Sequence, residues 1–136
     1  MSDSEKWGWW TLGVVALTIA AYGAFCAFLG HGPATSSVFA LLALTAIPAS
    51  SRRHFKGRTF DERERGIANR ALQAGFSVFW LAFVGLVIVA GFIKGWDSTL
   101  TVPMWALDET LWWAATLVMG VQALTTIVLY RGVSHA

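Results

Sequence analysis

Four long apolar segments, separated by short polar stretches, make up most of this 136-residue chain. They cover residues 10–29, 33–49, 67–93 and 111–130, and each reaches the roughly 17 residues or more with which an α-helix can cross the hydrocarbon core of a bilayer. Lipid offers the backbone no hydrogen-bond partner, so apolar segments of this length form helices. The pattern predicts an all-α fold: a four-transmembrane-helix up-and-down bundle in one integral membrane domain.

Turn and capping residues mark the ends of these segments. Residues 30–33 read Gly-His-Gly-Pro, in which the glycines end the first helix and Pro33 suits the first position of the second. Before the third segment, Thr59 and Asp61 each precede a glutamate by three residues, which is the spacing of a capping box. The third helix is therefore expected to begin near Asp61.

Acidic and aromatic residues lie at the expected membrane surfaces. The outer connector is expected to continue to Thr110. Asp108 and Glu109 lie at its end, at the start of the fourth span, where they suit the positive N-terminal end of the fourth helix. Tryptophan and tyrosine favour both membrane surfaces. The expected outer belt is Trp96, Trp105, Trp112 and Trp113, and the expected inner belt is Trp7, Trp9, Trp10 and Tyr130.

The composition agrees with a membrane protein, because 56% of the residues are hydrophobic and only 13% are charged, against about a quarter charged in soluble domains. Most of the ten Lys and Arg residues lie in or near residues 50–66. A basic loop beside membrane spans marks the cytoplasmic side, so this loop and both termini are predicted to be cytoplasmic. The same bias explains the excess of positive charge, and no nucleic-acid partner is expected.

The basic loop is the first candidate interaction surface. It is expected to dock a membrane or cytosolic protein partner, or to hold anionic lipid headgroups, at about 1 kcal/mol for each basic residue. The candidate docking residues are Arg52, Arg53, Lys56, Arg58, Arg63 and Arg65.

A polar stripe along the third helix is the second candidate surface. Glu62, Asn69, Gln73 and Ser77 follow one another at spacings of seven, four and four residues, so they share one helix face. Lipid cannot satisfy these groups, so the stripe is expected to form a hydrogen-bonded seam with another helix, with Gln122 as one partner, or else a docking face. Trp80 is expected to pack inside the bundle.

Small residues provide surfaces for close helix packing. They recur on the first segment, and Gly120 and Ala123 lie on the fourth, which makes a homo-oligomer possible. The small residues of the first segment are Ala16, Ala20, Gly23, Ala24 and Ala27.

Reaction chemistry is missing from the expected spans. No acid, base or histidine lies in the middle of any of them, whereas proton-coupled carriers and ion pathways need such a group. The histidines His31, His54 and His135 lie in loops or tails, and the single cysteine, Cys26, permits neither an intrachain disulfide nor a cysteine zinc site. We therefore expect no catalytic residues, no metal site and no cofactor, and we do not expect an enzyme.

The six residues from Phe60 to Arg65, Phe-Asp-Glu-Arg-Glu-Arg, precede the third apolar segment directly. This motif resembles the Asp-Glu-Arg-Glu signature of a family of small four-span bacterial and archaeal membrane proteins without an assigned function. The resemblance implies a multi-pass protein of the bacterial or archaeal cytoplasmic membrane. Together with the surfaces above, it favours an accessory or regulatory protein that acts through its cytoplasmic basic loop, and the alternative is a small oligomeric transporter or channel subunit.

Overall fold

The computed structural model describes residues 3–30, 33–46, 62–96, 99 and 101–134. Every element in these ranges is helical: α1 (Asp3–Leu29), α2 (Pro33–Ser36), the 3₁₀ helix η1 (Ser37–Ala46), α4 (Glu62–Lys94) and α5 (Met104–Ser134). Three helices, α1, α4 and α5, are long and apolar enough to cross a membrane. The all-α prediction is thus confirmed for the described residues, and the chain has the helices of a membrane protein.

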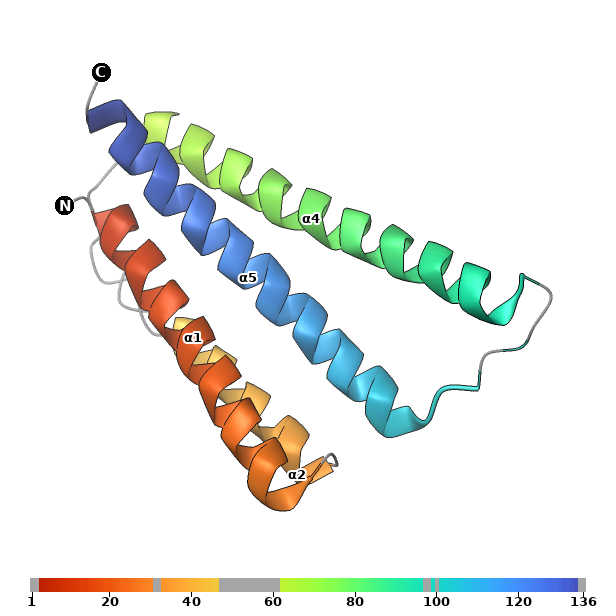
Figure 1. Cartoon of the computed structure of the whole chain (residues 1–136). Helices are drawn as coiled ribbons and strands as arrows, with labels where there is room; N and C mark the ends of the chain where they lie inside the picture. The colour runs from red at the N-terminus through yellow and green to blue at the C-terminus, as the bar shows by residue number, and fades with distance from the viewer. Residues whose placement is uncertain (1–2, 31–32, 47–61, 97–98, 100, 135–136) are drawn as a thin grey trace.

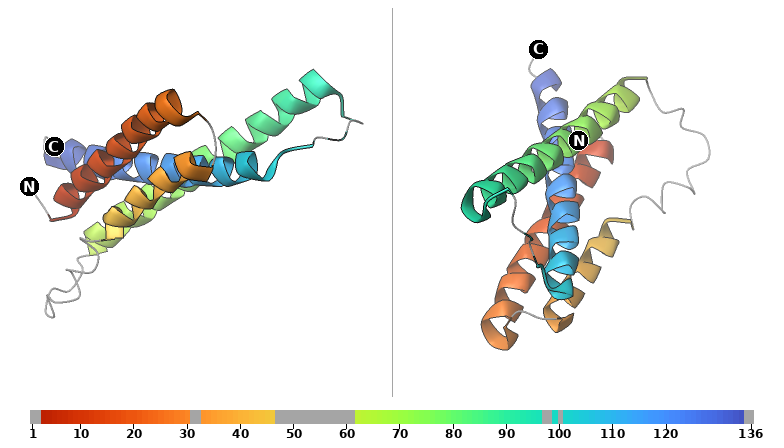
Figure 2. Two further views of the ribbon diagram at one scale, coloured as in Figure 1. Left: turned by 90° about the horizontal axis from the view of Figure 1, so that it is seen from below. Right: turned by 90° about the vertical axis from the view of Figure 1, so that its right-hand side faces the viewer.

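Helix α5 lies at the centre, with α1 on one side and α4 on the other (Figure 1). The α2–η1 segment follows α1 and packs along it, as Figure 2 shows from two other directions. The beginning of α1, the beginning of α4 and the end of α5 gather at one end of the molecule, which we call the terminal end. The opposite end, where α4 turns toward α5, is called the connector end.

Two helices end at a glycine in the left-handed backbone conformation. Gly30 has φ 75° and donates its N–H to the carbonyl of Cys26 at 3.1 Å, and Gly95 has φ 87° and donates to the carbonyl of Gly91 at 2.9 Å. Glycine adopts this conformation without steric cost, so each glycine closes the last helical turn. Helix α1 therefore ends where the glycines of residues 30–33 predict, and α2 begins at Pro33 as expected.

Helices α1 and α5 pack antiparallel through small residues. A Cβ atom at Gly8 would lie 3.1 Å from Ile127 Cγ1, and a Cβ atom at Gly120 would lie 3.5 Å from Val15 Cγ1. Ala123 is also buried. Gly120 and Ala123 thus serve packing within the chain, whereas the small residues of α1 that are expected to form an oligomer contact are all exposed.

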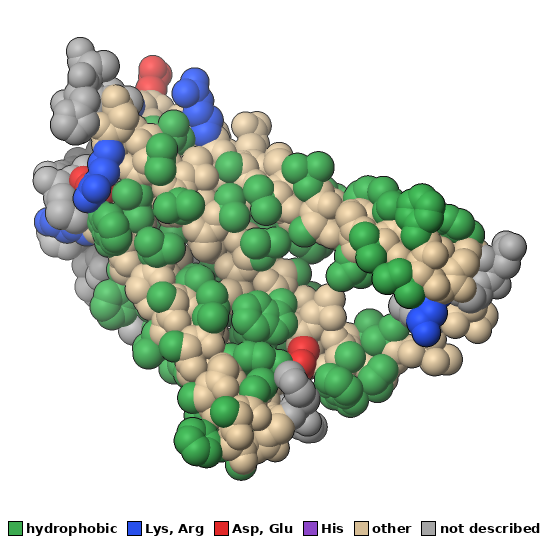
Figure 3. All heavy atoms as spheres, viewed as in Figure 1, with side chains coloured by type: hydrophobic (Ala, Val, Ile, Leu, Met, Phe, Trp, Pro, Cys, Tyr) green, Lys and Arg blue, Asp and Glu red, His purple; other side chains and the backbone are tan. Residues whose placement is uncertain are grey.

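The contact between α4 and α5 covers only the part of α4 near the terminal end. One stripe of α4 is buried at Ile67, Ala71 and Gly75, half-buried at Val78, and exposed from Ala82 onward. At Gly75 the two backbones touch, because a Cβ atom there would lie 3.0 Å from the Val118 carbonyl oxygen. Beyond this contact the helices diverge, which leaves the opening between them that is visible in Figure 3.

Helix α5 begins earlier than the sequence pattern predicts. The carbonyl of Pro103 accepts hydrogen bonds from the N–H groups of Ala106 at 3.0 Å and Leu107 at 3.3 Å, and the helix begins at Met104. The expected connector up to Thr110 is therefore wrong in its second half. As a consequence, Glu109 lies inside the helix and not at its N-terminus.

Three buried threonines of α1 and α5 find hydrogen-bond acceptors within their own helices. The hydroxyls of Thr18, Thr116 and Thr126 each donate at 2.8 Å to the carbonyl four residues earlier. Such local bonds satisfy a hydroxyl where neither water nor a partner helix does. The helices can therefore bury these polar residues without an interhelical network.

Candidate functional site

A carboxylate is buried between α1 and α5. Glu109 is 8% exposed and Tyr22 is 9% exposed. The Tyr22 hydroxyl donates a hydrogen bond of 2.9 Å to Glu109 Oε2. This hydrogen bond joins a side chain of α1 to one of α5, so the pair ties the two helices together near the connector end.

Aromatic rings surround this pair. The ring of Tyr22 meets the edge of Trp113 with centroids 5.1 Å apart, and lies 5.3 Å from the ring of Phe39 on η1. Phe39 is completely buried and stacks on Trp112 at 6.0 Å. Trp112 and Trp113 are therefore part of a cluster that joins three elements, and the prediction that they also belong to an outer aromatic belt stays a prediction.

Glu109 lies near the beginning of the candidate span that starts at Met104, so the expectation that no acid lies in the middle of a span is not contradicted, but its burial is not predicted. The sequence does carry a signal for this position, because Glu109, Thr116 and Ala123 are spaced by seven residues and all three are buried. A spacing of seven places residues on one helix face. The sequence pattern instead places Glu109 at the N-terminal end of the fourth helix, before a span expected to begin at Leu111, and so leaves it outside the repeat.

The expected polar stripe lies on the outside of the single chain. Glu62, Asn69, Gln73 and Ser77 are all exposed. At 100° per residue they lie on the side of α4 opposite to the buried stripe of Ile67, Ala71 and Gly75. The seam with another helix of the same chain is therefore absent from the described residues, and Gln122, half-buried on α5, does not meet it.

Trp80 shares this outer face. Its side chain is 57% exposed, so the expectation that it packs inside the bundle is wrong. Its ring contacts are with its own helix: Phe79 at 5.7 Å and Phe83 at 5.9 Å between centroids. The polar stripe thus continues toward the connector end as an exposed aromatic surface.

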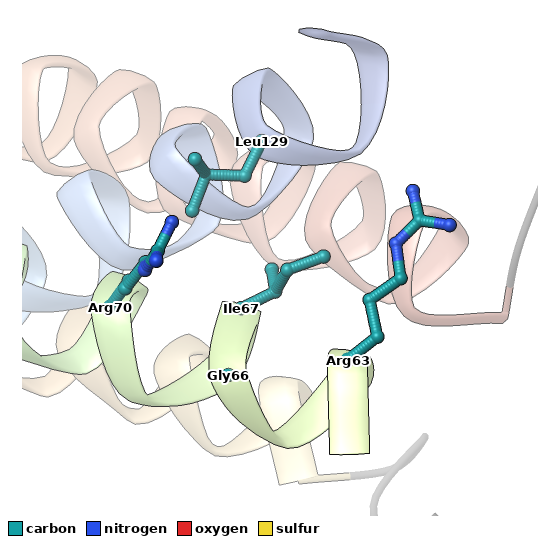
Figure 4. A pocket seen from close by; sticks show the side chains of 5 residues that line it. All are labelled: Arg63, Gly66, Ile67, Arg70 and Leu129. Atoms are coloured by element: carbon teal, nitrogen blue, oxygen red, sulfur yellow. The ribbon is translucent and has the colours of Figure 1, made fainter. Parts of the chain in front are cut away.

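Only part of the predicted basic docking surface lies among the described residues, at the beginning of α4. Arg52, Arg53, Lys56 and Arg58 lie outside the described residues, as do Thr59 and Asp61 of the expected caps. Arg63 and Arg65 are exposed on α4. Arg63 lines a cavity of about 240 Å³ together with Gly66, Ile67, Arg70 and Leu129, shown in Figure 4. Sequence reasoning left Arg70 out, although its spacing of seven from Arg63 places both on one helix face.

An ion pair and a cation–π contact join α1 to α5 at the terminal end. Arg131 Nε lies 3.6 Å from Glu5 Oε1, and the Arg131 guanidinium lies 5.3 Å from the ring centre of Trp9. Trp10 donates its indole N–H to the Leu44 carbonyl at 3.1 Å. These contacts hold α1, η1 and α5 together beside the expected inner aromatic belt.

Neither a metal-binding cluster nor a known relative indicates the function of the described residues. Within the part of the chain that the structure describes, no three His, Cys, Asp or Glu side chains group closely enough to hold a metal ion. Comparison of the chain with protein-family models, curated proteins and solved structures finds no match. The resemblance of the Asp-Glu-Arg-Glu motif to a family of small membrane proteins stays a prediction.

Proposed function

We propose that this chain is a membrane accessory or regulatory protein that binds a partner through α4 and the basic segment before it. The observation that carries the proposal is the exposed polar face of Asn69, Gln73 and Ser77 on a membrane helix. Toward Ser77 this face enters the hydrocarbon, where amide and hydroxyl groups lack hydrogen-bond partners, which favours association with another polar helix surface. The partner is a membrane protein or a second copy of the chain.

We further propose four spans, with both termini in the cytoplasm of a bacterial or archaeal cell. The chain leaves α1 at the connector end and begins α4 at the terminal end, and α2 and η1, which lie between them in the sequence, pack along α1. Four α-helical and ten 3₁₀ residues of α2 and η1 extend about 26 Å at 1.5 and 2.0 Å per residue. This length approaches the roughly 30 Å hydrocarbon core and supports a short second span.

A photo-crosslinking experiment tests the interaction. Trp80 lies on the polar side of α4 and is replaced by a photoreactive phenylalanine, in cells that express the protein at its natural level. We expect a crosslinked protein product that is lost when Asn69→Leu and Gln73→Leu remove the polar groups. Leu86, which is 62% exposed on a different face, is the matched control position and should give no such product.

Two outcomes would contradict the proposal. One is that position 80 forms no protein crosslink in intact membranes. The other is that the product persists unchanged in the Asn69→Leu/Gln73→Leu variant, because the polar groups would then have no part in the contact.

The second candidate is a small oligomeric transporter, and the buried Glu109 favours it. An ionisable side chain within a membrane helix is costly and often marks a proton or ion pathway. Here the Tyr22 hydroxyl and the surrounding rings provide a plausible structural role for the same carboxylate. A transporter would lose activity on Glu109→Gln, whereas an interaction protein would keep its position-80 crosslink.

A further inference from the structure

A groove between α4 and α5 combines positive charge with an apolar floor. It is the cavity of about 240 Å³ lined by Arg63, Gly66, Ile67, Arg70 and Leu129. In Figure 4, the side chains of Arg63 and Arg70 rise from α4 on either side of Ile67, and Leu129 reaches toward them from α5. A side chain at Gly66 would meet nothing within 4 Å, so the groove is open on that side.

The positive charges of the two arginines are not neutralised by an acidic side chain of the described residues. Within the described part of the chain, Arg63 and Arg70 form no ion pair. Their spacing of seven residues, two helical turns, directs both to the α5 side of α4, whereas Arg65 lies about 140° away around the helix from Arg70. Each guanidinium can present two parallel N–H donors to a phosphate group.

The position of the groove along α4 matches the headgroup layer of a bilayer. Helix α4 has 33 residues and is about 50 Å long at 1.5 Å per residue, well beyond a hydrocarbon core of roughly 30 Å. Its first turns, which contain the groove, therefore stand at the membrane surface. Long arginine side chains at such a position bury their stems and keep the charge among headgroups.

We propose that this groove binds an anionic phospholipid of the surrounding membrane. Arg63 and Arg70 hold the phosphate, and the upper part of an acyl chain lies against Ile67 and Leu129. The apolar floor distinguishes this ligand from a soluble phosphate, which has nothing to place there. The groove adjoins the polar stripe, since Arg70 lies seven residues before Ser77, but the arginines hold the lipid and not Asn69 or Gln73, so this inference does not rest on the proposed partner.

Native mass spectrometry of the full chain in a mild detergent tests the site. Dioleoyl phosphatidylglycerol is titrated against dioleoyl phosphatidylcholine, which has the same chains and no net charge. Each basic residue near an anionic surface contributes about a fivefold gain in affinity. We expect one phosphatidylglycerol to bind preferentially, and Arg63→Gln/Arg70→Gln to weaken its binding about 30-fold.

Arg65→Gln is the matched control, because it removes the same charge at a neighbouring exposed position outside the groove. It should change the affinity less than twofold. If the double variant does not insert, Arg70→Gln by itself should weaken binding about fivefold. Equal binding of the two lipids, equal losses in the control and groove variants, or displacement of the lipid by millimolar glycerol 3-phosphate would overturn the proposal.

Discussion

At the scale of single residues, the Tyr22–Glu109 pair shows how a membrane protein accommodates a buried acid. The carboxylate receives a hydroxyl donor at 2.9 Å and lies among aromatic rings from α1, η1 and α5. Removing one partner of a buried polar pair leaves the other with the cost of its desolvation. The pair is therefore expected to contribute to stability beyond its apolar contacts.

A double-mutant cycle measures this contribution. Tyr22→Phe removes the donor and should lower the free energy of unfolding by about 1 to 3 kcal/mol. In a Glu109→Leu background the same change should cost much less, because the acceptor is gone. Unfolding in SDS, followed by the fluorescence of the neighbouring tryptophans, gives both values.

Tyr130→Phe is the matched control for this cycle. The Tyr130 hydroxyl is buried and forms no hydrogen bond within the described part of the chain. Its removal should leave stability nearly unchanged or raise it slightly. A Tyr22→Phe cost that is equal in the two Glu109 backgrounds would show that the hydrogen bond contributes nothing measurable.

At the scale of elements, α4 changes its role along its length. Near the terminal end its small residues allow the backbone to approach α5, and beyond Val78 the same stripe is exposed. Large apolar side chains, including Leu86, Val89 and Ile93, cover the far half and suit a lipid environment. The contact between α4 and α5 thus depends on a short region around Gly75.

Gly75→Leu should separate the two helices at this region. A Cβ atom at this position would lie 3.0 Å from the Val118 carbonyl oxygen and 3.2 Å from Val118 Cγ1, and the backbone oxygen cannot rotate away as a side chain can. Overpacking of this kind costs about 1 to 3 kcal/mol. Thermal unfolding in detergent, combined with a disulfide crosslink between engineered cysteines on α4 and α5, should show both the loss of stability and the loss of contact.

Gly85→Leu is the corresponding control on the same helix. A Cβ atom at Gly85 would meet nothing within 4 Å, so the new side chain has room. Its higher helix propensity should leave stability unchanged or improve it by up to about 1 kcal/mol. If Gly75→Leu were equally harmless, the close approach at Val118 would not determine how α4 packs.

At the scale of the whole molecule, three long helices and the α2–η1 segment pack together through some of their faces and leave other faces exposed. The core joins α1, η1 and α5 around Tyr22 and Phe39, and α4 attaches to α5 at the terminal end. The arginine groove lies beside the outer polar stripe on α4.

The direction of the chain in the membrane can be measured by cysteine labelling. In a Cys26→Ser background, cysteines replace Glu62 at the terminal end and Thr99 at the connector end, both of which are exposed. The basic residues that precede and begin α4 should keep this end inside. A membrane-impermeant maleimide added to intact cells should label position 99 and leave position 62 unlabelled until the membrane is permeabilised. The reverse pattern would refute the proposed orientation.

The sequence by itself determined the long helices and most of their ends. Apolar segments of sufficient length must form helices in lipid, and Gly30, Pro33 and Gly95 act through local backbone preferences that do not depend on the rest of the fold. The beginning of α4 near Asp61 follows from the same kind of local signal. These features are predictable because each involves residues close together in the chain.

Only the tertiary structure decided which face of each helix is covered. The polar stripe of α4 satisfies the sequence pattern for an inward face, yet α5 packs on the opposite face, because Gly75 and Ala71 permit a closer backbone approach than the larger polar side chains do. In the same way, Glu109 becomes a buried partner of Tyr22, 87 residues away in the chain, because α1 and α5 pack together. Such pairings depend on how surfaces fit in three dimensions, and periodicity along one helix carries no information about its neighbour.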